Sequence, residues 1–188
     1  MNDALNQFID HCRAAASTGG DAASCVDAIL PLMRDLLTGP LDFITDEHRR
    51  SDPDHYARNA IYLSDDDAIS LFSLVWRPGQ WTPVHDHGTW GVVGIAEGLL
   101  EERAYQRTDE AGNAVAGLSL ARGGSVLLPP GAVTSFVPNP DHIHKTGVAD
   151  DQEPCLSLHL YGRVLSDFHV YDVDAGTRKL IQVAHFKS

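Results

Sequence analysis

The stretch HDHGTWG, residues 85–91, places two histidines two positions apart and follows them with small residues. Side chains alternate between the two faces of a strand, so His85 and His87 would share one face while Asp86 points to the other. Two imidazoles on one face can bind the same metal ion, although a metal site needs at least a third ligand. Three later histidines are the candidates for that ligand: His142, His144 and His159.

Glycines and a proline on either side of this stretch stand at regular spacings. Gly79 is separated from His85 by five residues, and Gly98 follows the histidine pair. Further along the chain, five residues separate Gly123 from Pro129, and one separates Pro129 from Gly131. Both spacings resemble the two motifs of the cupins, whose double-stranded jelly-roll barrel holds a metal.

The rest of the chain divides into a helical part and a longer β part. Residues 1–40 carry apolar residues at helical spacing in two sets, with Pro31 inside the second set. We expect two helices there, the second either starting near Pro31 or kinked by it. From residue 56 to 188 the chain has short β-rich runs separated by turn signals, such as AISLFSLVW and CLSLHLYG. The sequence therefore predicts a mainly β fold in one domain, 1–188, a cupin jelly-roll barrel with N-terminal helices packed outside.

Composition narrows the classes of protein to consider. The chain has 188 residues, about the length of one domain, with 26 acidic and 14 basic side chains and a net charge of -12. That charge repels phosphate backbones, so we expect no nucleic-acid partner. No apolar run approaches the roughly 18 residues that a membrane span needs. The three cysteines form no CxxC pair, which indicates a reducing, cytoplasmic location and a metal site built from nitrogen or oxygen.

The usual cupin glutamate ligand is missing. It would stand four residues after the second histidine, where this sequence has Gly91. A face of three neutral histidines leaves a divalent cation with its full charge, unlike a face of two histidines and one carboxylate. Such a site would favour anionic substrate ligands. The alternative is that these histidines are surface or core residues that bind no metal.

A polar row follows near the end of the predicted barrel. Ser157, His159 and Tyr161 stand at every second position of one strand, and leucines occupy the positions between them. Buried hydroxyl and imidazole groups cost about 1–3 kcal/mol each unless they are hydrogen-bonded, so we expect a connected relay. A Ser-His hydrolase is disfavoured, because nothing marks Ser157 as a nucleophile elbow. An ordinary strand with a solvated polar face remains the alternative.

Four segments together resemble the cysteine dioxygenase family of thiol dioxygenases: PVHDHGTWG, DHIH, SLHLYG, and YARN at residues 56–59. The resemblance implies Fe(II) held by three histidines. It selects His85, His87 and His144, because the family's third ligand precedes the serine of the last motif by about a dozen residues. His142 is the alternative third ligand, or a residue that lines the entrance.

The same resemblance implies roles for the remaining site residues. Arg58, 27 residues before His85, would bind the substrate carboxylate, with Tyr56 of the same segment beside it. The Ser157–His159–Tyr161 row would lie next to the iron, with the Tyr161 hydroxyl directed at the substrate and oxygen site. The implied reaction adds both atoms of O2 to the sulfur of a small carboxylate-bearing thiol, with cysteine giving cysteine sulfinate.

Departures from the family leave alternatives open. Mammalian members cross-link a cysteine to the active-site tyrosine, but no cysteine lies between Cys25 and Cys155, so Tyr161 should be unmodified. PVHDHGTWG, with VWRPGQ before it, also resembles bacterial enzymes that prefer 3-mercaptopropionate, which generally have glutamine in place of Arg58. Arg58 favours cysteine, and mercaptosuccinate is a further alternative. A cupin that binds a metal and a small molecule without catalysis, or holds nickel or zinc for other chemistry, is the alternative of a different class. For at least two of Trp76, Trp81 and Trp90 we expect core packing.

Overall fold

The structure is a computed structural model that describes residues 3–138 and 142–186. It begins with two helices, α1 (Asp3–Ser17) and α2 (Ala22–Thr38), as the sequence predicts. Helix α2 starts at Ala22, where the Asp21 side chain accepts a hydrogen bond of 2.8 Å from the Ser24 amide, so the expected start near Pro31 is wrong. Within the described residues, neither helix combines the length and hydropathy that crossing a bilayer requires.

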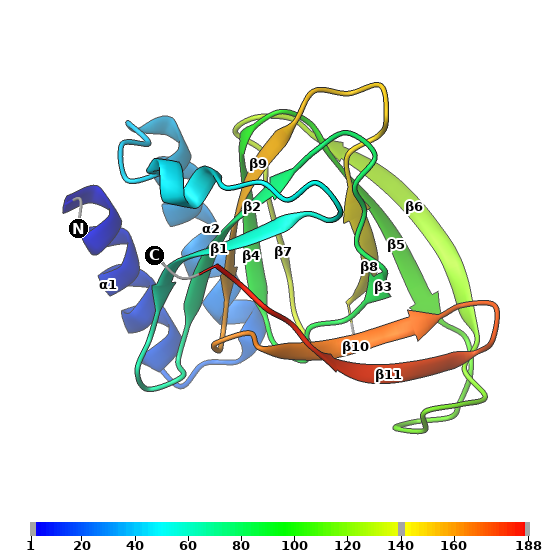
Figure 1. The fold of residues 1–188 in the computed structure, drawn as a ribbon. Helices are drawn as coiled ribbons and strands as arrows, with labels where there is room; N and C mark the ends of the chain where they lie inside the picture. Colours follow the sequence, from blue (N-terminus) through cyan, green and yellow to red (C-terminus); the bar gives the residue numbers. More distant parts are fainter. Residues whose placement is uncertain (1–2, 139–141, 187–188) are drawn as a thin grey trace.

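Eleven strands in the described part of the chain form two antiparallel sheets, preceded by a short 3-10 helix, η1 (Asp46–Arg49). The five-stranded sheet has the order β1 (Ala57–Leu63), β2 (Ser70–Trp76), β9 (Cys155–Tyr161), β4 (Gly91–Glu97), β7 (Val133–Phe136). The six-stranded sheet has the order β11 (Thr177–Gln182), β10 (Asp167–Asp172), β3 (Val84–His85), β8 (Ile143–Gly147), β5 (Leu100–Arg107), β6 (Leu120–Leu128). The two sheets face each other around a common interior (Figure 1). This arrangement confirms the predicted cupin barrel.

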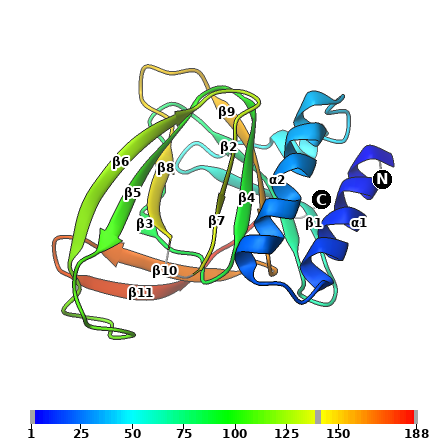
Figure 2. The ribbon, with the colours of Figure 1, turned by 180° about the vertical axis from the view of Figure 1, so that it is seen from behind.

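The two helices pack against the outside of the five-stranded sheet, as predicted, and Figure 2 shows α2 beside β4 and β7. Their apolar side chains join those of the sheet's outer face in one core cluster. Leu156, Leu158 and Leu160 of β9 belong to this cluster and are at most 3% exposed. Burying each leucine contributes roughly 1.5–3 kcal/mol, so β9 is fixed from outside and presents its polar alternate positions to the barrel interior.

Two features of the barrel differ from the sequence prediction. Strand β3 is only two residues long, so His85 lies on it while His87 follows in extended chain without regular pairing. Four other strands were not anticipated because they are short or polar: β7, β8, β10 and β11. Asp141, the first residue of DHIH, lies outside the described residues.

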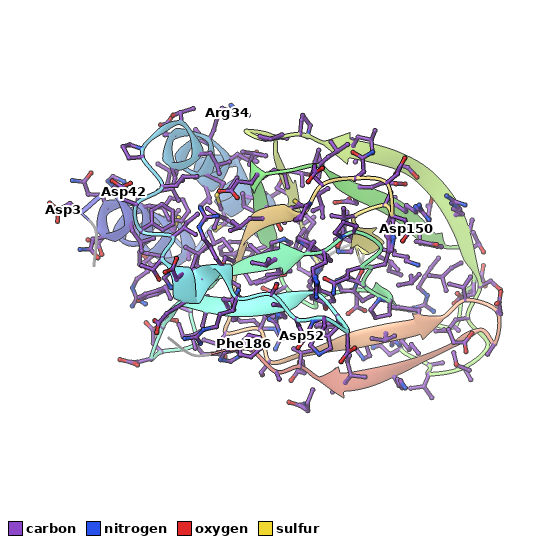
Figure 3. The ribbon with its side chains drawn as sticks, turned by 45° about the horizontal axis from the view of Figure 1, so that its top comes forward. Asp3, Arg34, Asp42, Asp52, Asp150 and Phe186 are labelled. Atoms are coloured by element: carbon purple, nitrogen blue, oxygen red, sulfur yellow. The ribbon has the colours of Figure 1, made fainter. Side chains whose placement is uncertain are left out.

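Side chains fill the space between the sheets (Figure 3). Asp3, Arg34 and Asp42 lie on the helical side of the molecule, and Asp150 lies on a loop at the far side of the barrel. The segment that ends at Phe186 runs beside β1, where the Phe186 amide donates to the Arg58 carbonyl at 2.8 Å. The C-terminal segment therefore covers the end of the barrel where Arg58 enters it.

Candidate metal centre

Three histidines from separate points in the sequence meet inside the barrel. His144 on β8 is the direct cross-strand partner of His85 on β3. His87 lies two residues after His85 in the sequence. One nitrogen from each of the three rings lies within 4.8 Å of the other two, and the Nε2 atoms of His85 and His87 are 3.2 Å apart. All three side chains are at most 4% exposed. The structure thus brings together the three histidines that the family resemblance selects.

Burial keeps these three imidazoles neutral. It lowers the pKa of His85 and His87 well below the usual range, and each also feels the positive charge that a neighbouring histidine would carry. Burial likewise lowers the pKa of His144. A neutral imidazole donates from one nitrogen and accepts at the other. His85 donates from Nδ1 to the Pro83 carbonyl at 3.1 Å, so its Nε2 lone pair faces the other histidines.

The donor set fits a divalent cation. His87 Nδ1 and His144 Nε2 are buried and have no hydrogen-bond partner among residues 3–138 and 142–186. Buried polar atoms are rarely left without a partner, and a cation between the rings would satisfy His144 Nε2. Two ring nitrogens bound at roughly 2.1 Å to one ion would themselves be about 3 Å apart, as those of His85 and His87 are. Imidazole ligands suit iron, nickel, copper and zinc.

A carboxylate stands behind His144. Glu102 on β5 is 9% exposed, and one of its carboxylate oxygens lies 3.5 Å from His144 Nδ1 while the other lies 3.3 Å from His142 Nε2. Burial raises the pKa of Glu102, but its interactions with His142 and His144 lower that pKa by more than burial raises it. The net result is a pKa well below the usual range of a glutamate. The sequence does not predict the place of Glu102, because that place depends on the pairing of β5 with β8, which no local pattern reveals.

His142 belongs to a different group from His85 and His87. One of its ring nitrogens lies within 4.8 Å of a ligand atom of Glu102 and of His144. Its ring stacks on Phe136 with centroids 5.2 Å apart. His142 also lines a cavity of about 830 Å³ on the far side of Phe136 from His87. The structure therefore places His142 between this cavity and the three-histidine centre.

Gly91 and Phe136 explain why the usual cupin glutamate has no room here. Phe136 stacks on His87 with ring centroids 4.3 Å apart and an interplanar angle of 18°. A Cβ atom at Gly91 would lie 2.2 Å from the Phe136 ring, which is closer than packed atoms can approach. Gly91 also stands directly opposite Tyr161 in the pairing of β4 with β9. Phe136 thus fills the space that a longer side chain at position 91 would need.

The polar row on β9 is a connected hydrogen-bonded chain, and Trp76 extends it. Trp76 Nε1 donates to Ser157 Oγ at 2.9 Å, Ser157 Oγ lies 2.9 Å from His159 Nε2, and the Tyr161 hydroxyl lies 3.2 Å from His159 Nδ1. The alternative, an ordinary strand with a solvated polar face, is wrong, because all three β9 residues are at most 4% exposed. Of the three tryptophans, Trp76 is fully buried in the core, as expected of core packing, yet it also binds this polar chain.

The direction of this chain follows from its chemistry. The indole nitrogen only donates, so Ser157 accepts from Trp76 and directs its own proton to His159 Nε2; otherwise a buried hydroxyl proton would be left without an acceptor. Burial lowers the pKa of His159 to about 3, so the ring is neutral and donates from Nδ1 to the Tyr161 oxygen. Burial also raises the pKa of Tyr161, which keeps its hydroxyl protonated. The Tyr161 O–H is therefore available to donate into the pocket.

Arg58 and Tyr56 line the same pocket as the three histidines, His159 and Tyr161. Arg58 is 6% exposed; its Nη2 donates to the Leu165 carbonyl at 2.9 Å, and its guanidinium carbon lies 4.5 Å from the Phe72 ring centroid. Its Nη1 is buried without a hydrogen-bond partner within the described part of the chain. Tyr56 stacks on Trp76 with ring centroids 4.6 Å apart. The pocket thus combines a metal-binding face, a buried cation and a hydroxyl donor.

The fold and this centre define a cupin with a buried three-histidine metal site. A family model described as "Cysteine dioxygenase type I" matches residues 26–174. The chain belongs to this family, and the family match together with the buried three-histidine site makes it a metal-dependent thiol dioxygenase.

Solved structures are similar at low sequence identity. A cupin-like protein from Thermotoga maritima is 14% identical over 74% of this chain and 88% of its own, with a TM-score of 0.45. The protein TT1209 from Thermus thermophilus is 19% identical over 66% of this chain and 95% of its own, with a TM-score of 0.43. Hydroquinone 1,2-dioxygenase from Sphingomonas sp. TTNP3 is 9% identical over 73% of this chain and 72% of its own, with a TM-score of 0.47.

Proposed function

We propose that this protein uses Fe(II), held by His85, His87 and His144, to oxidise cysteine to cysteine sulfinate with O2. The observation that carries the proposal is the shared pocket, in which three buried, neutral histidines face the same space as the Arg58 guanidinium and the Tyr161 hydroxyl. When bound, the iron would stabilise the substrate as a thiolate and activate O2, so that both oxygen atoms reach the sulfur. Three free, buried cysteines are consistent with a reducing, cytoplasmic setting.

Arg58 would bind the substrate carboxylate. A buried guanidinium is costly unless an anion accompanies it, and its Nη1 is the atom without a partner in the described part of the chain. The Leu165 carbonyl and the Phe72 ring fix the rest of the group, so the free nitrogen has a defined position. A carboxylate bound there would fix the distance from Arg58 to the substrate sulfur. Tyr56 would form the neighbouring wall through its stacking on Trp76.

The charges in the pocket support a substrate with one carboxylate. Fe(II) and Arg58 would together carry three positive charges, and Glu102 returns one negative charge. A thiolate with a single carboxylate then leaves the group neutral, as for 3-mercaptopropionate or for cysteine bound with its amine unprotonated, whereas a second carboxylate, as in mercaptosuccinate, leaves an uncompensated buried charge. This charge balance favours cysteine or 3-mercaptopropionate over mercaptosuccinate. Between cysteine and 3-mercaptopropionate, the presence of Arg58 favours cysteine.

Tyr161 would act by donating a hydrogen bond. The chain that runs from Trp76 through Ser157 and His159 leaves the Tyr161 proton directed at the pocket. Tyr161 would then orient the bound substrate and oxygen without binding the metal itself. His159 would hold the Tyr161 oxygen in place and keep its proton pointing inward.

Oxygen uptake tests the proposal. Iron-loaded protein, prepared without air, receives cysteine, 3-mercaptopropionate, mercaptosuccinate or cysteamine in separate reactions. We expect the highest kcat/KM with cysteine and negligible uptake with cysteamine, which has no carboxylate for Arg58. Arg58→Gln should lower kcat/KM for cysteine roughly 10- to 100-fold, the cost of one or two charged hydrogen bonds. Arg49→Gln, which removes an exposed ion pair with Glu97, is the control.

Two results would contradict this assignment. Unchanged kinetics in Arg58→Gln would remove Arg58 from substrate binding. No uptake with any of the four thiols would favour a cupin that binds a metal and a small molecule without catalysis.

A further inference from the structure

Glu102 enters the function proposed above only through its charge, yet its carboxylate is buried against a proposed metal ligand. It projects from β5 into the barrel, where it stands opposite Thr146 while His144 stands opposite Ala104. These positions make Glu102 and His144 diagonal neighbours on the inner face of adjacent strands. The contact between the Glu102 carboxylate and His144 Nδ1 is 3.5 Å, on the side of the ring opposite to Nε2.

This contact selects one tautomer of His144. A carboxylate only accepts hydrogen bonds, so His144 must carry its proton on Nδ1, which leaves the Nε2 lone pair for a metal. His142 provides the competing arrangement, because its Nε2 lies 3.3 Å from His144 Nδ1. If His142 donated to that atom, His144 would carry its proton on Nε2 and could not bind the metal there. Glu102 prevents this by accepting from His142 as well, at 3.3 Å.

We propose that Glu102 is a positioning residue for the metal centre: its carboxylate holds His144 in the ligating tautomer and adds a negative charge behind a set of neutral ligands. The inference rests on the proposed metal site. The glutamate that cupins usually place among the ligands is replaced by Gly91 here, and Glu102 restores its charge from the next strand without entering the coordination sphere. Carboxylates placed behind ligating histidines typically change metal affinity 10- to 100-fold.

Glu102, His142 and His144 could instead hold a separate metal ion, since their ligand atoms also lie within 4.8 Å of one another. The buried Nε2 of His144 argues against it. That atom has no hydrogen-bond partner in residues 3–138 and 142–186, and the centroid of its ring lies 4.6 Å from that of His85 and 4.9 Å from that of His87. An ion at the three-histidine centre would satisfy it, whereas an ion beside Glu102 would leave it without a partner. A neutral imidazole has only one lone pair for a metal.

The test measures metal binding and protonation in the absence of thiol. Glu102→Met removes both acceptor oxygens at similar length, and Glu102→Gln removes the charge but keeps one acceptor oxygen, with an NH2 donor in place of the other. Glu101→Gln is the matched control, because Glu101 is the adjacent residue and pairs instead with Arg103 at 2.8 Å. Co(II) is titrated into each full-length, metal-free protein and followed by its visible absorption. Nitrogen-15 spectra of the metal-free proteins report which nitrogen of His144 carries the proton.

We expect Glu102→Met to bind Co(II) 10- to 100-fold more weakly and to shift the His144 proton from Nδ1 to Nε2. Glu102→Gln should fall between Glu102→Met and wild type, and Glu101→Gln should match wild type. Wild-type affinity in Glu102→Met, an Nε2 proton on His144 in the wild type, or two Co(II) ions per chain would overturn the proposal. The wild-type spectrum decides the matter if Glu102→Met does not fold. A wild-type protein that binds Co(II) but oxidises no thiol would contradict the proposed function and leave this role intact.

Discussion

Trp76 determines which way the hydrogen bonds of the buried polar chain run. Its indole nitrogen has no acceptor capacity, and the distances to Ser157 and on to His159 are both 2.9 Å. Because Trp76 can only donate, each group along the chain accepts from the one before it and donates to the next. The last group, the Tyr161 hydroxyl, is therefore left with a proton to donate into the pocket. The alternation of residues along one strand predicts the Ser157–His159–Tyr161 row, but it does not predict the donor on β2 that orients it.

Trp76→Phe removes this donor and keeps an aromatic ring against Tyr56. Ser157 can then accept from His159 instead, so the chain loses its direction and the Tyr161 proton is no longer directed at the pocket. We expect kcat to fall roughly 10- to 100-fold with the iron content unchanged, and we expect the same for Tyr161→Phe, which removes the hydroxyl itself. Trp90→Phe, which alters a half-buried ring beside the helices, is the control. Wild-type kcat in Trp76→Phe would show that the direction of the chain does not matter.

Strand pairing explains what the sequence could and could not predict about the site. His85 and His87 follow from spacing within one segment, and the period of two on β9 places its polar row. The positions of Glu102 and Trp76 depend on how β5 pairs with β8 and how β2 pairs with β9. Those registers are contacts between distant segments, so local patterns do not reveal them. The predicted barrel was correct because its turns carry local signals such as Gly98.

Gly98 joins β4 to β5 and is the clearest of these turn positions. Its φ is +75°, and a Cβ atom there would lie 2.3 Å from the Pro154 carbonyl oxygen. Gly98→Ala should therefore lower the free energy of unfolding by roughly 1–3 kcal/mol or more, because backbone must move. Gly112→Ala is the matched control, since Gly112 also has a positive φ of +57° but has nothing within 4 Å of the added atom. Equal losses in denaturant unfolding of the two variants would contradict this account of the turn.

Across the whole molecule, the closed barrel keeps its histidines away from water, and this makes the metal-free fold sensitive to acid. Burial lowers the pKa of His159 from 6.5 to about 3, and the unfolded chain binds this proton more readily than the native protein. The stabilisation from a neutral His159 is complete above pH 6.5 and is lost as the pH falls towards 3.

We expect the free energy of unfolding of the metal-free protein to fall as the pH is lowered through this range. His159→Gln should remove up to about 1.4 kcal/mol per pH unit from that slope, the value for one proton. His11→Gln, on the exposed side of α1, should keep the wild-type slope. Denaturant titrations at several pH values between 4 and 7 measure both slopes. A slope in His159→Gln equal to that of wild type would contradict the assigned burial of a neutral ring.

A thiol dioxygenase adds both atoms of O2 to the sulfur of its substrate, and the proposed function places this step at the three-histidine centre. Turnover of cysteine by the iron-loaded protein under oxygen-18 gas, followed by mass spectrometry of the product, tests it most directly. We expect cysteine sulfinate that carries two labelled oxygen atoms, and no such product from His87→Ala, which should lack iron. Sulfinate with one labelled atom, or labelled sulfinate formed equally by His87→Ala, would contradict it.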